Sequence, residues 1–134
     1  MGCVSFLEVY REYIVPKLQE IDIFLKSSEE PLRVEDVAEI LNIDGDNLDG
    51  IMVDIGISEI SRAAFIEIMK RGDSHICRLF RRETEIGSPP TYTHDQIAYI
   101  YNLDKNQVKN ACKKLKIGEA TAFTMPMVFA EILV

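Results

Sequence analysis

The chain has 134 residues, of which 47% are hydrophobic, and its 22 acidic and 15 basic side chains give a net charge of −7. That length suits one compact domain or two very small ones, and the apolar content is ordinary for a globular protein. No apolar run approaches the roughly 20 residues that span a bilayer, and three scattered cysteines do not form a disulfide framework. The sequence thus excludes a transmembrane helix and indicates a cytoplasmic protein. The Met-Gly-Cys start resembles lipidated N-termini, but Phe6 stands where myristoylation requires Ser or Thr.

The charge is unevenly distributed along the chain. Residues 1–70 carry 15 acidic and 6 basic side chains, whereas residues 71–134 carry 7 acidic and 9 basic ones. A polyanion would therefore be repelled by the first half and weakly attracted by the second.

Residues 1–28 are expected to form an N-terminal amphipathic helical segment. Apolar side chains recur every three or four positions over Val4–Leu25, which is the period of a helix with one buried face. Pro16 interrupts the pattern and cannot donate a backbone hydrogen bond, so we expect a kink or a break there. The run Ser27–Pro31 predicts a stop and a linker.

Residues 32–72 are expected to form a first helix-turn-helix-like repeat. The pattern predicts short helices over Val34–Leu41 and Asn47–Asp54, then a third helix capped by Ser61, with Gly72 as its C-terminal cap. Residues 73–88 predict a connecting basic helix without a copy elsewhere in the chain. Arg71 before this helix and His75, Arg78 and Arg82 within it are spaced by four, three and four residues, so we expect them to line one face.

Residues 91–134 are expected to form the second repeat. Helices are predicted over Thr93–Tyr101, Lys105–Lys116 and about Thr124–Leu133, and the apolar C-terminus is expected to dock on another surface. Short extended pieces are predicted at Leu32–Arg33 and Thr91–Tyr92.

The two repeats align without a gap when the chain is shifted by sixty positions. Val34–Met69 then lies on His94–Phe129, and the apolar pattern is kept at the pairs Val37/Ile97, Ile43/Leu103, Leu48/Val108 and Ile55/Leu115. The identical pairs are Ala38/Ala98, Ile40/Ile100, Asn42/Asn102, Asp44/Asp104, Ile57/Ile117 and Glu59/Glu119. Such self-similarity predicts two copies of one small helical unit, and hence an all-α protein with the N-terminal and central basic helices packed on its repeats.

Val34–Ile43 reads Val-Glu-Asp-Val-Ala-Glu-Ile-Leu-Asn-Ile, and Thr93–Leu103 repeats this pattern. The pattern resembles the helix-turn-helix of excisionase- and MerR-like bacterial or phage DNA-binding regulators over about 22 residues in each copy. In such a motif the small alanine lets the helices cross closely, and asparagine tolerates the positive φ of the turn. A plain helical hairpin is the alternative interpretation.

The resemblance implies transcription regulation through DNA, and the two copies differ in how well they suit it. The first copy places Asp44, Asp46 and Asp49 where phosphates would lie, so we interpret it as a degenerate, structural partner. The second copy presents lysines for phosphates and asparagines for adenine edges, beside basic residues of the central helix. The predicted DNA-binding residues are Lys105, Asn106, Lys109, Asn110, Lys113, Lys114, Arg78 and Arg82. A homodimer on two half-sites is expected.

A protein-interaction adaptor without DNA binding is the alternative function. The acidic charge favours it, and the N-terminal helix or the apolar C-terminal tail would then contact the partner. An enzyme is not expected, because no phosphate loop, nucleophile–base pair or metal-ligand spacing is visible. Asp44–Gly50 superficially resembles a calcium loop, but the later bidentate glutamate is missing and Ile55 occupies its place. No cofactor, metal or catalytic residue is therefore predicted.

Overall fold

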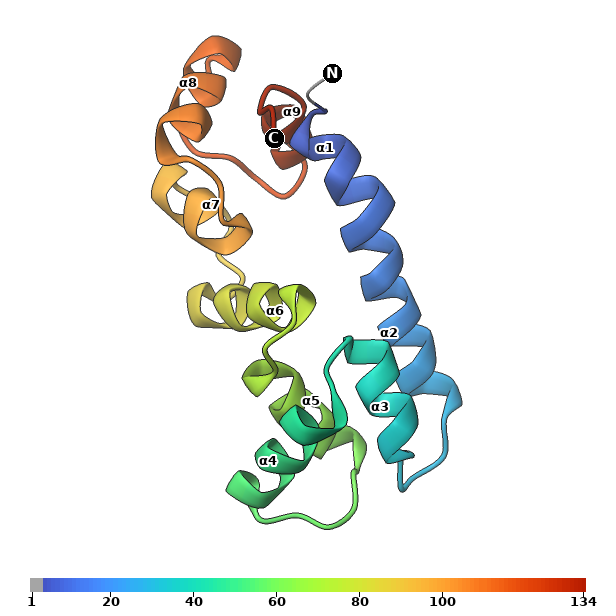
Figure 1. The fold of residues 1–134 in the computed structure, drawn as a ribbon. Coiled ribbons are helices and arrows are strands. Elements are labelled where there is room, and N and C mark those ends of the chain that lie inside the picture. The colour runs from blue at the N-terminus through green and yellow to red at the C-terminus, as the bar shows by residue number, and fades with distance from the viewer. Residues whose placement is uncertain (1–3) are drawn as a thin grey trace. The chain divides into compact units, whose positions relative to one another are not determined.

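The structure is a computed structural model, and it describes residues 4–134 (Figure 1). The fold is all-α as predicted, and β pairing among the described residues amounts to isolated bridges. None of the helices in this range has the length and apolarity needed to cross a membrane. Cys3 and the rest of the Met-Gly-Cys start lie outside the described residues.

The chain forms two compact units whose boundaries fall inside helices. One unit comprises residues 16–81, and the other combines residues 1–15 with residues 82–134. This division differs from the predicted one, which kept residues 1–28 and 73–88 as separate segments. In the structure, the first of these segments is divided between the units at residue 15 and the second at residue 81.

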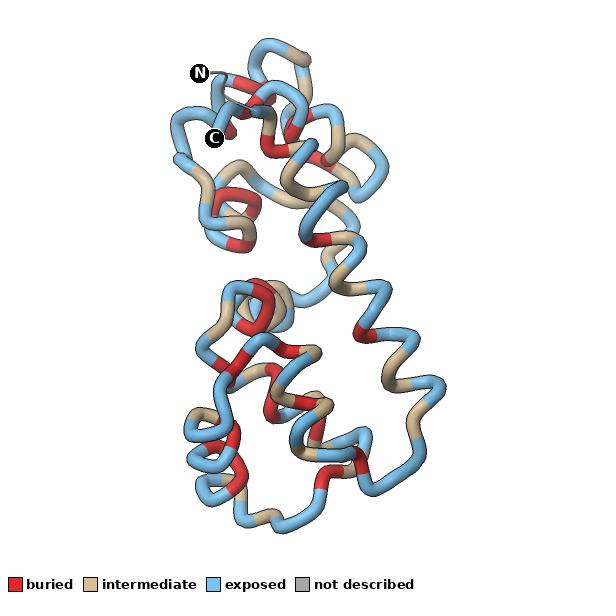
Figure 2. Tube along the Cα trace, turned by 45° about the vertical axis from the view of Figure 1, so that its right-hand side comes forward, coloured by how far each residue is buried: buried red, intermediate tan, exposed pale blue. Residues whose placement is uncertain are grey.

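The unit of residues 16–81 contains most of α2 (Val15–Ser27), then α3 (Val34–Leu41), α4 (Gly45–Ile55), α5 (Arg62–Arg71) and the start of α6 (His75–Ile86). Its core consists of buried apolar side chains from every helix and from the connections between them, and Figure 2 colours buried residues red along the Cα trace. The largest are Leu41, Leu48, Phe65, Ile68 and Leu79.

The other unit contains the end of α6, α7 (His94–Tyr101), α8 (Lys105–Leu115), α9 (Met125–Ala130) and the N-terminal α1 (Phe6–Val9). Phe6 packs edge-to-face on Phe129, with 4.8 Å between ring centroids, and its amide donates to the carbonyl of Ile132 over 2.7 Å. The apolar C-terminus therefore docks on the chain's own N-terminal segment. Its outermost residues, Leu133 and Val134, remain about half exposed.

The structure repeats with the same offset of sixty residues as the sequence. α3 and α7 have matching bounds, as do α4 and α8, and the bridge between Leu32 and Ile60 recurs between Tyr92 and Ala120. Residues 51–61 and 111–121 have the same burial class at every position. The extended pieces predicted at Leu32 and Tyr92 are thus confirmed as one partner of each bridge.

α6 has no copy in sequence, but α2 occupies the matching place in the order of helices. α6 precedes α7 as α2 precedes α3, and the shift of sixty places residues 15–27 on residues 75–87. Sequence comparison misses the pair because their side chains differ in character. Arg71 also does not extend the basic face of α6, since it ends α5 before the break at Gly72.

The interruption expected at Pro16 appears as a π-helical segment. Residues Tyr10–Ile14 form a π-helix between α1 and α2. A proline nitrogen carries no hydrogen and leaves a gap in the helical hydrogen-bond ladder, and a π-helical turn is one way to accommodate such a gap. The helix therefore continues through Pro16 and does not break.

The helix ends explain three residues that the sequence singled out. Asn42 and Asn102 end α3 and α7 with φ of 55° and 53°, which confirms the predicted left-handed turn residues. Gly72 caps the C-terminus of α5 as predicted, but its φ of −64° shows that it does so without a left-handed conformation. Glycine is needed there for space, because a Cβ would lie 2.5 Å from the sulfur of Cys77.

Candidate nucleic-acid interface

The predicted DNA-reading helix α8 is fixed at both ends and along one side. The Asp104 carboxylate accepts hydrogen bonds from the backbone amides of Asn106 and Gln107 at 2.8 and 3.0 Å, which caps the N-terminus. Val108, Ala111 and Cys112 are buried and hold the helix against its unit. Burial raises the pKa of the Cys112 thiol, so this sulfur is kept in its unreactive, protonated form.

The outward side of α8 carries four of the predicted residues as one continuous face. Asn106, Lys109, Asn110 and Lys113 are all exposed, and on a helix with 3.6 residues per turn they occupy adjoining positions opposite the buried side. Two of these side chains are cations that suit phosphates, and two are amides that suit base edges. The structure therefore brings together four of the eight residues that the sequence proposed for phosphate and base contacts.

The two lysines at the edges of this face have partners within the unit. The ammonium of Lys105 lies 3.1 Å from the Asp95 carboxylate of α7, and that of Lys114 lies 2.7 Å from the Glu131 carboxylate after α9. Lys105, Asp95 and Lys114 are well exposed, so both pairs are surface interactions worth only ~0–1 kcal/mol each. A phosphate can compete for such lysines, but it must displace a carboxylate.

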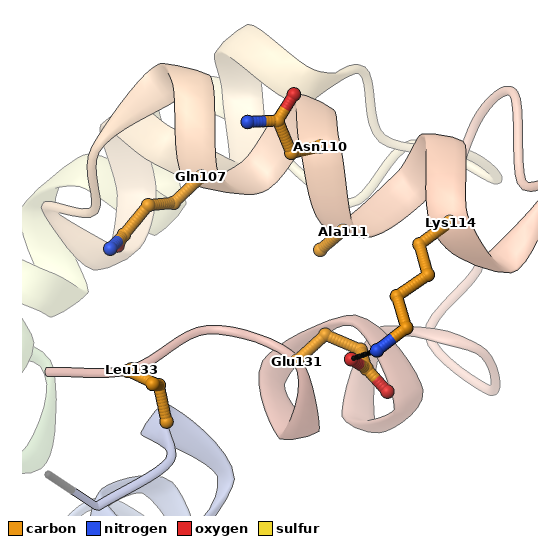
Figure 3. A pocket seen from close by; sticks show the side chains of 6 residues that line it. All are labelled: Gln107, Asn110, Ala111, Lys114, Glu131 and Leu133. Atoms are coloured by element: carbon orange, nitrogen blue, oxygen red, sulfur yellow. Dashed lines mark hydrogen bonds and ion pairs between the residues drawn. The ribbon is translucent and has the colours of Figure 1, made fainter.

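Lys114 also closes one side of a shallow groove between α8 and the C-terminal segment. Figure 3 shows its ammonium reaching across to Glu131, with the Gln107 side chain further along the same helix. The groove is lined by Gln107, Asn110, Ala111, Lys114, Glu131 and Leu133. Glu131 could not be predicted as a partner from the sequence, because Lys114 and Glu131 are 17 positions apart and are separated by a turn and α9.

Arg78 and Arg82, the two predicted residues of α6, are divided between the two units. Arg78 is exposed on the part of α6 that belongs to the unit of residues 16–81. The guanidinium of Arg82 is half-buried, and its Nε donates to the carbonyl of Ile100 over 2.9 Å. Arg82 therefore satisfies a carbonyl in the last turn of α7, a structural contact for a residue predicted to bind DNA.

The matching face of α4 has the opposite character. The positions equivalent to Asn106, Lys109 and Lys113 hold Asp46, Asp49 and Val53, all of them exposed. Two carboxylates and a valine that is 77% exposed offer nothing that attracts a phosphate. The geometry is thus shared between the two copies, and the surface chemistry is not.

The unit that contains the acidic helix α4 is also the more negatively charged of the two units. The unit of residues 16–81 contains 14 acidic and 8 basic side chains, and the other unit contains 8 acidic and 7 basic ones. Their net charges are −6 and −1, which together give the −7 of the chain. Among the described residues, no group of three acidic, histidine or cysteine side chains is placed to hold a metal ion.

No family model matches the chain, and no match was found among curated proteins or solved structures. The fold and the site together define an all-α protein made of two compact helical units. One unit presents an acidic outer helix, and the other presents a lysine- and asparagine-bearing one.

Proposed function

We propose that the protein is a DNA-binding regulator in which α7 and α8 act as the helix-turn-helix and α8 reads DNA. The observation that carries the proposal is the exposed face of Asn106, Lys109, Asn110 and Lys113 on a helix capped and packed like its acidic counterpart. The three-residue turn 102–104 between α7 and α8, with its left-handed Asn102, supports the same interpretation.

The first copy serves as a structural partner in this proposal. Its outer helix carries Asp46 and Asp49 at the positions where α8 carries Asn106 and Lys109, so it would repel the phosphate backbone. Because one recognition helix contacts only a few base pairs, we propose that two chains associate as a homodimer on an operator with two half-sites. Light scattering with and without DNA measures this association.

The test is fluorescence polarisation with a labelled random-sequence duplex at low salt, followed by selection from genomic fragments. The chain is expected to bind, and Lys109→Glu with Lys113→Glu is expected to abolish binding, since each change replaces an attraction with a repulsion. Lys26→Glu with Arg71→Glu makes the same change in net charge on exposed residues of the other unit and should preserve most of the affinity. Equal losses in both double variants, or no binding by the unmodified chain, would contradict the proposal.

A second candidate, a protein-interaction adaptor, is favoured by exposed apolar side chains around the start of α9. Phe123 is 89% exposed and Met127 is 50% exposed. An aromatic ring left in water at a loop is a common anchor in protein interfaces. The C-terminal tail is a weaker candidate than predicted for this role, because its Phe129 and Ile132 are buried within the unit.

The adaptor function is tested by affinity capture from the native host with the chain and with Phe123→Ser as bait. A specific partner should be captured by the unmodified chain and lost with Phe123→Ser. Thr84→Ser, a small change at an exposed position of α6, is the control and should retain the partner. Capture that is unaffected by Phe123→Ser would exclude this surface as the binding site.

A further inference from the structure

A small cavity lined by aromatic rings and one carboxylate lies within the unit that contains α8. Its volume is about 160 Å³, and it is lined by Tyr10, Glu83, Tyr92, Tyr101, Ala122, Met125, Pro126 and Phe129. The ring of Tyr101 lies 6.0 Å from that of Tyr10 and 4.8 Å from that of Phe129, measured between centroids. Three of the five tyrosines in the chain therefore meet at one opening.

Glu83 is the charged residue among those that line the cavity. It is half-buried, and burial raises the pKa of its carboxyl. The same carboxylate raises the pKa of Tyr10 and of Tyr101, in addition to the larger effect of their own burial, which shows that the acid and the phenols are close enough to interact. A cation would relieve this unfavourable burial of negative charge.

We propose that this cavity binds an organic cation, either a quaternary ammonium or a guanidinium group, with Glu83 as the counter-charge and the tyrosine rings as its walls. Aromatic faces attract cations within about 6 Å of the ring centroid, and such walls with an acid recognise alkylated ammonium groups. An anion would face the Glu83 carboxylate, and a neutral apolar group would leave that carboxylate desolvated without compensation.

The first copy does not share this lining. The position that matches Ala122 is Arg62, an exposed arginine that donates to the Leu25 carbonyl at 2.7 Å and to the Glu30 carboxylate at 3.0 Å. The matches of these two partners, Glu85 and Pro90, do not line the cavity. The positions that match Tyr92, Tyr101 and Glu83 hold Leu32, Leu41 and Ile23, so the aromatic and acidic lining belongs to the second copy alone.

The size of the cavity limits the ligand to a head group. A water occupies about 30 Å³ in the liquid, so 160 Å³ corresponds to the space of about five waters. A trimethylammonium or guanidinium group fits that space, while a drug-sized ligand needs roughly 300 Å³ or more. The cation can therefore be a free small amine or the end of a side chain on a partner.

The experiment uses tyrosine fluorescence, because the chain has no tryptophan and three of its five tyrosines line the cavity. Tetramethylammonium chloride and an amidated Gly-Arg-Gly peptide are titrated into the full chain, with sodium chloride at matched ionic strength and tert-butanol as the neutral analogue. A saturable response to either cation supports the proposal. A response to tetramethylammonium alone indicates a free amine, and a response to the peptide alone indicates a side chain.

Three variants locate the response. Glu83→Gln is expected to weaken binding at least about tenfold, which corresponds to about 1.4 kcal/mol. Ala122→Arg places a long cationic side chain at a residue that lines the cavity, and it should abolish the response by occupying the cavity and repelling a second cation. Glu85→Gln removes an exposed acid from the same helix and should leave the response unchanged. Circular dichroism checks that each variant remains folded.

The proposal is independent of DNA binding by α8, and the two can fail separately. No saturable response to either cation, or an equal response to tert-butanol, would overturn it. So would unchanged binding by the folded Glu83→Gln and Ala122→Arg variants.

Discussion

α4 and α8 occupy matching positions in the repeat, but their exposed residues differ. Each begins after an aspartate cap, buries three residues at matching positions and ends on a left-handed residue. One then exposes Asp46, Asp49 and Val53, and the other exposes Asn106, Lys109 and Lys113. Buried positions are held by packing, where even one methylene changes stability, whereas exposed positions are free to diverge. Function in this protein should therefore be sought where the copies differ.

The largest effects are expected where the two copies share a buried position. Phe129→Ala should destabilise its unit by about 3–5 kcal/mol, and the matching Met69→Ala by about 2–5 kcal/mol, since both side chains are almost completely buried. Urea denaturation followed by circular dichroism measures both. Phe123→Ala, at an exposed ring, is the control and should change stability by less than about 0.5 kcal/mol. A loss below about 1 kcal/mol for Phe129→Ala would contradict the described core.

The next effect concerns the residue that ends α4 and α8. Gly56 has φ of 73° and Lys116 has φ of 57°, a conformation that costs a side chain about 1–2 kcal/mol. Gly56→Ala should therefore destabilise by about 1 kcal/mol, although its Cβ would meet nothing within 4 Å. Lys116→Gly should stabilise slightly by relieving the same strain. Denaturation midpoints that shift in the opposite directions would refute the shared left-handed cap.

The start of the preceding helix gives a similar contrast. Thr93 caps α7 in a capping box with Gln96, whereas the matching Arg33 gives α3 no side-chain cap. Thr93→Ala should cost about 0.5–2 kcal/mol, and Arg33→Ser should add up to about 1 kcal/mol. Thermal unfolding measures both changes. Arg33→Ala serves as the control for loss of the arginine, and stabilisation equal to that of Arg33→Ser would show that the hydroxyl is not the cause.

The smallest of these effects is expected within α4. Gly50 lies inside this helix, and a Cβ there would meet nothing within 4 Å. Gly50→Ala should therefore stabilise by about 0.5–1 kcal/mol, because alanine loses less conformational freedom on folding. The matching Asn110→Ala should stabilise by less, since asparagine is a better helix former than glycine. Destabilisation by Gly50→Ala would indicate a steric requirement that the structure does not contain.

Much of the fold could be predicted because it follows from local patterns. The period of the apolar residues, the cap at Ser61 and the asparagine turns each depend on residues close in sequence. The division into units could not be predicted, because it depends on Phe6 packing against Phe129 at the other end of the chain. The need for glycine at position 72 could not be predicted either, because it arises from the close approach of Cys77 in the next helix.

The candidate site could be predicted in part. The exposure of Asn106, Lys109, Asn110 and Lys113 follows from helix periodicity alone. The contacts of Lys105, Lys114 and Arg82 do not, because each joins side chains or carbonyls from different elements. The aromatic cavity was also missed, although its signal is visible in the alignment of the copies as Tyr92 and Tyr101 against Leu32 and Leu41.

The most direct test of the central claim exchanges the outer residues of the two helices. Lys109→Asp with Lys113→Val gives α8 the residues of α4, and Asp49→Lys with Val53→Lys gives α4 the residues of α8. DNA affinity is then measured over a range of salt concentrations. The first exchange should abolish binding or lower the salt slope by about 2, because each phosphate contact contributes about 0.9. The second exchange should not lower the affinity. An unchanged affinity and salt slope in the first exchange would contradict the account.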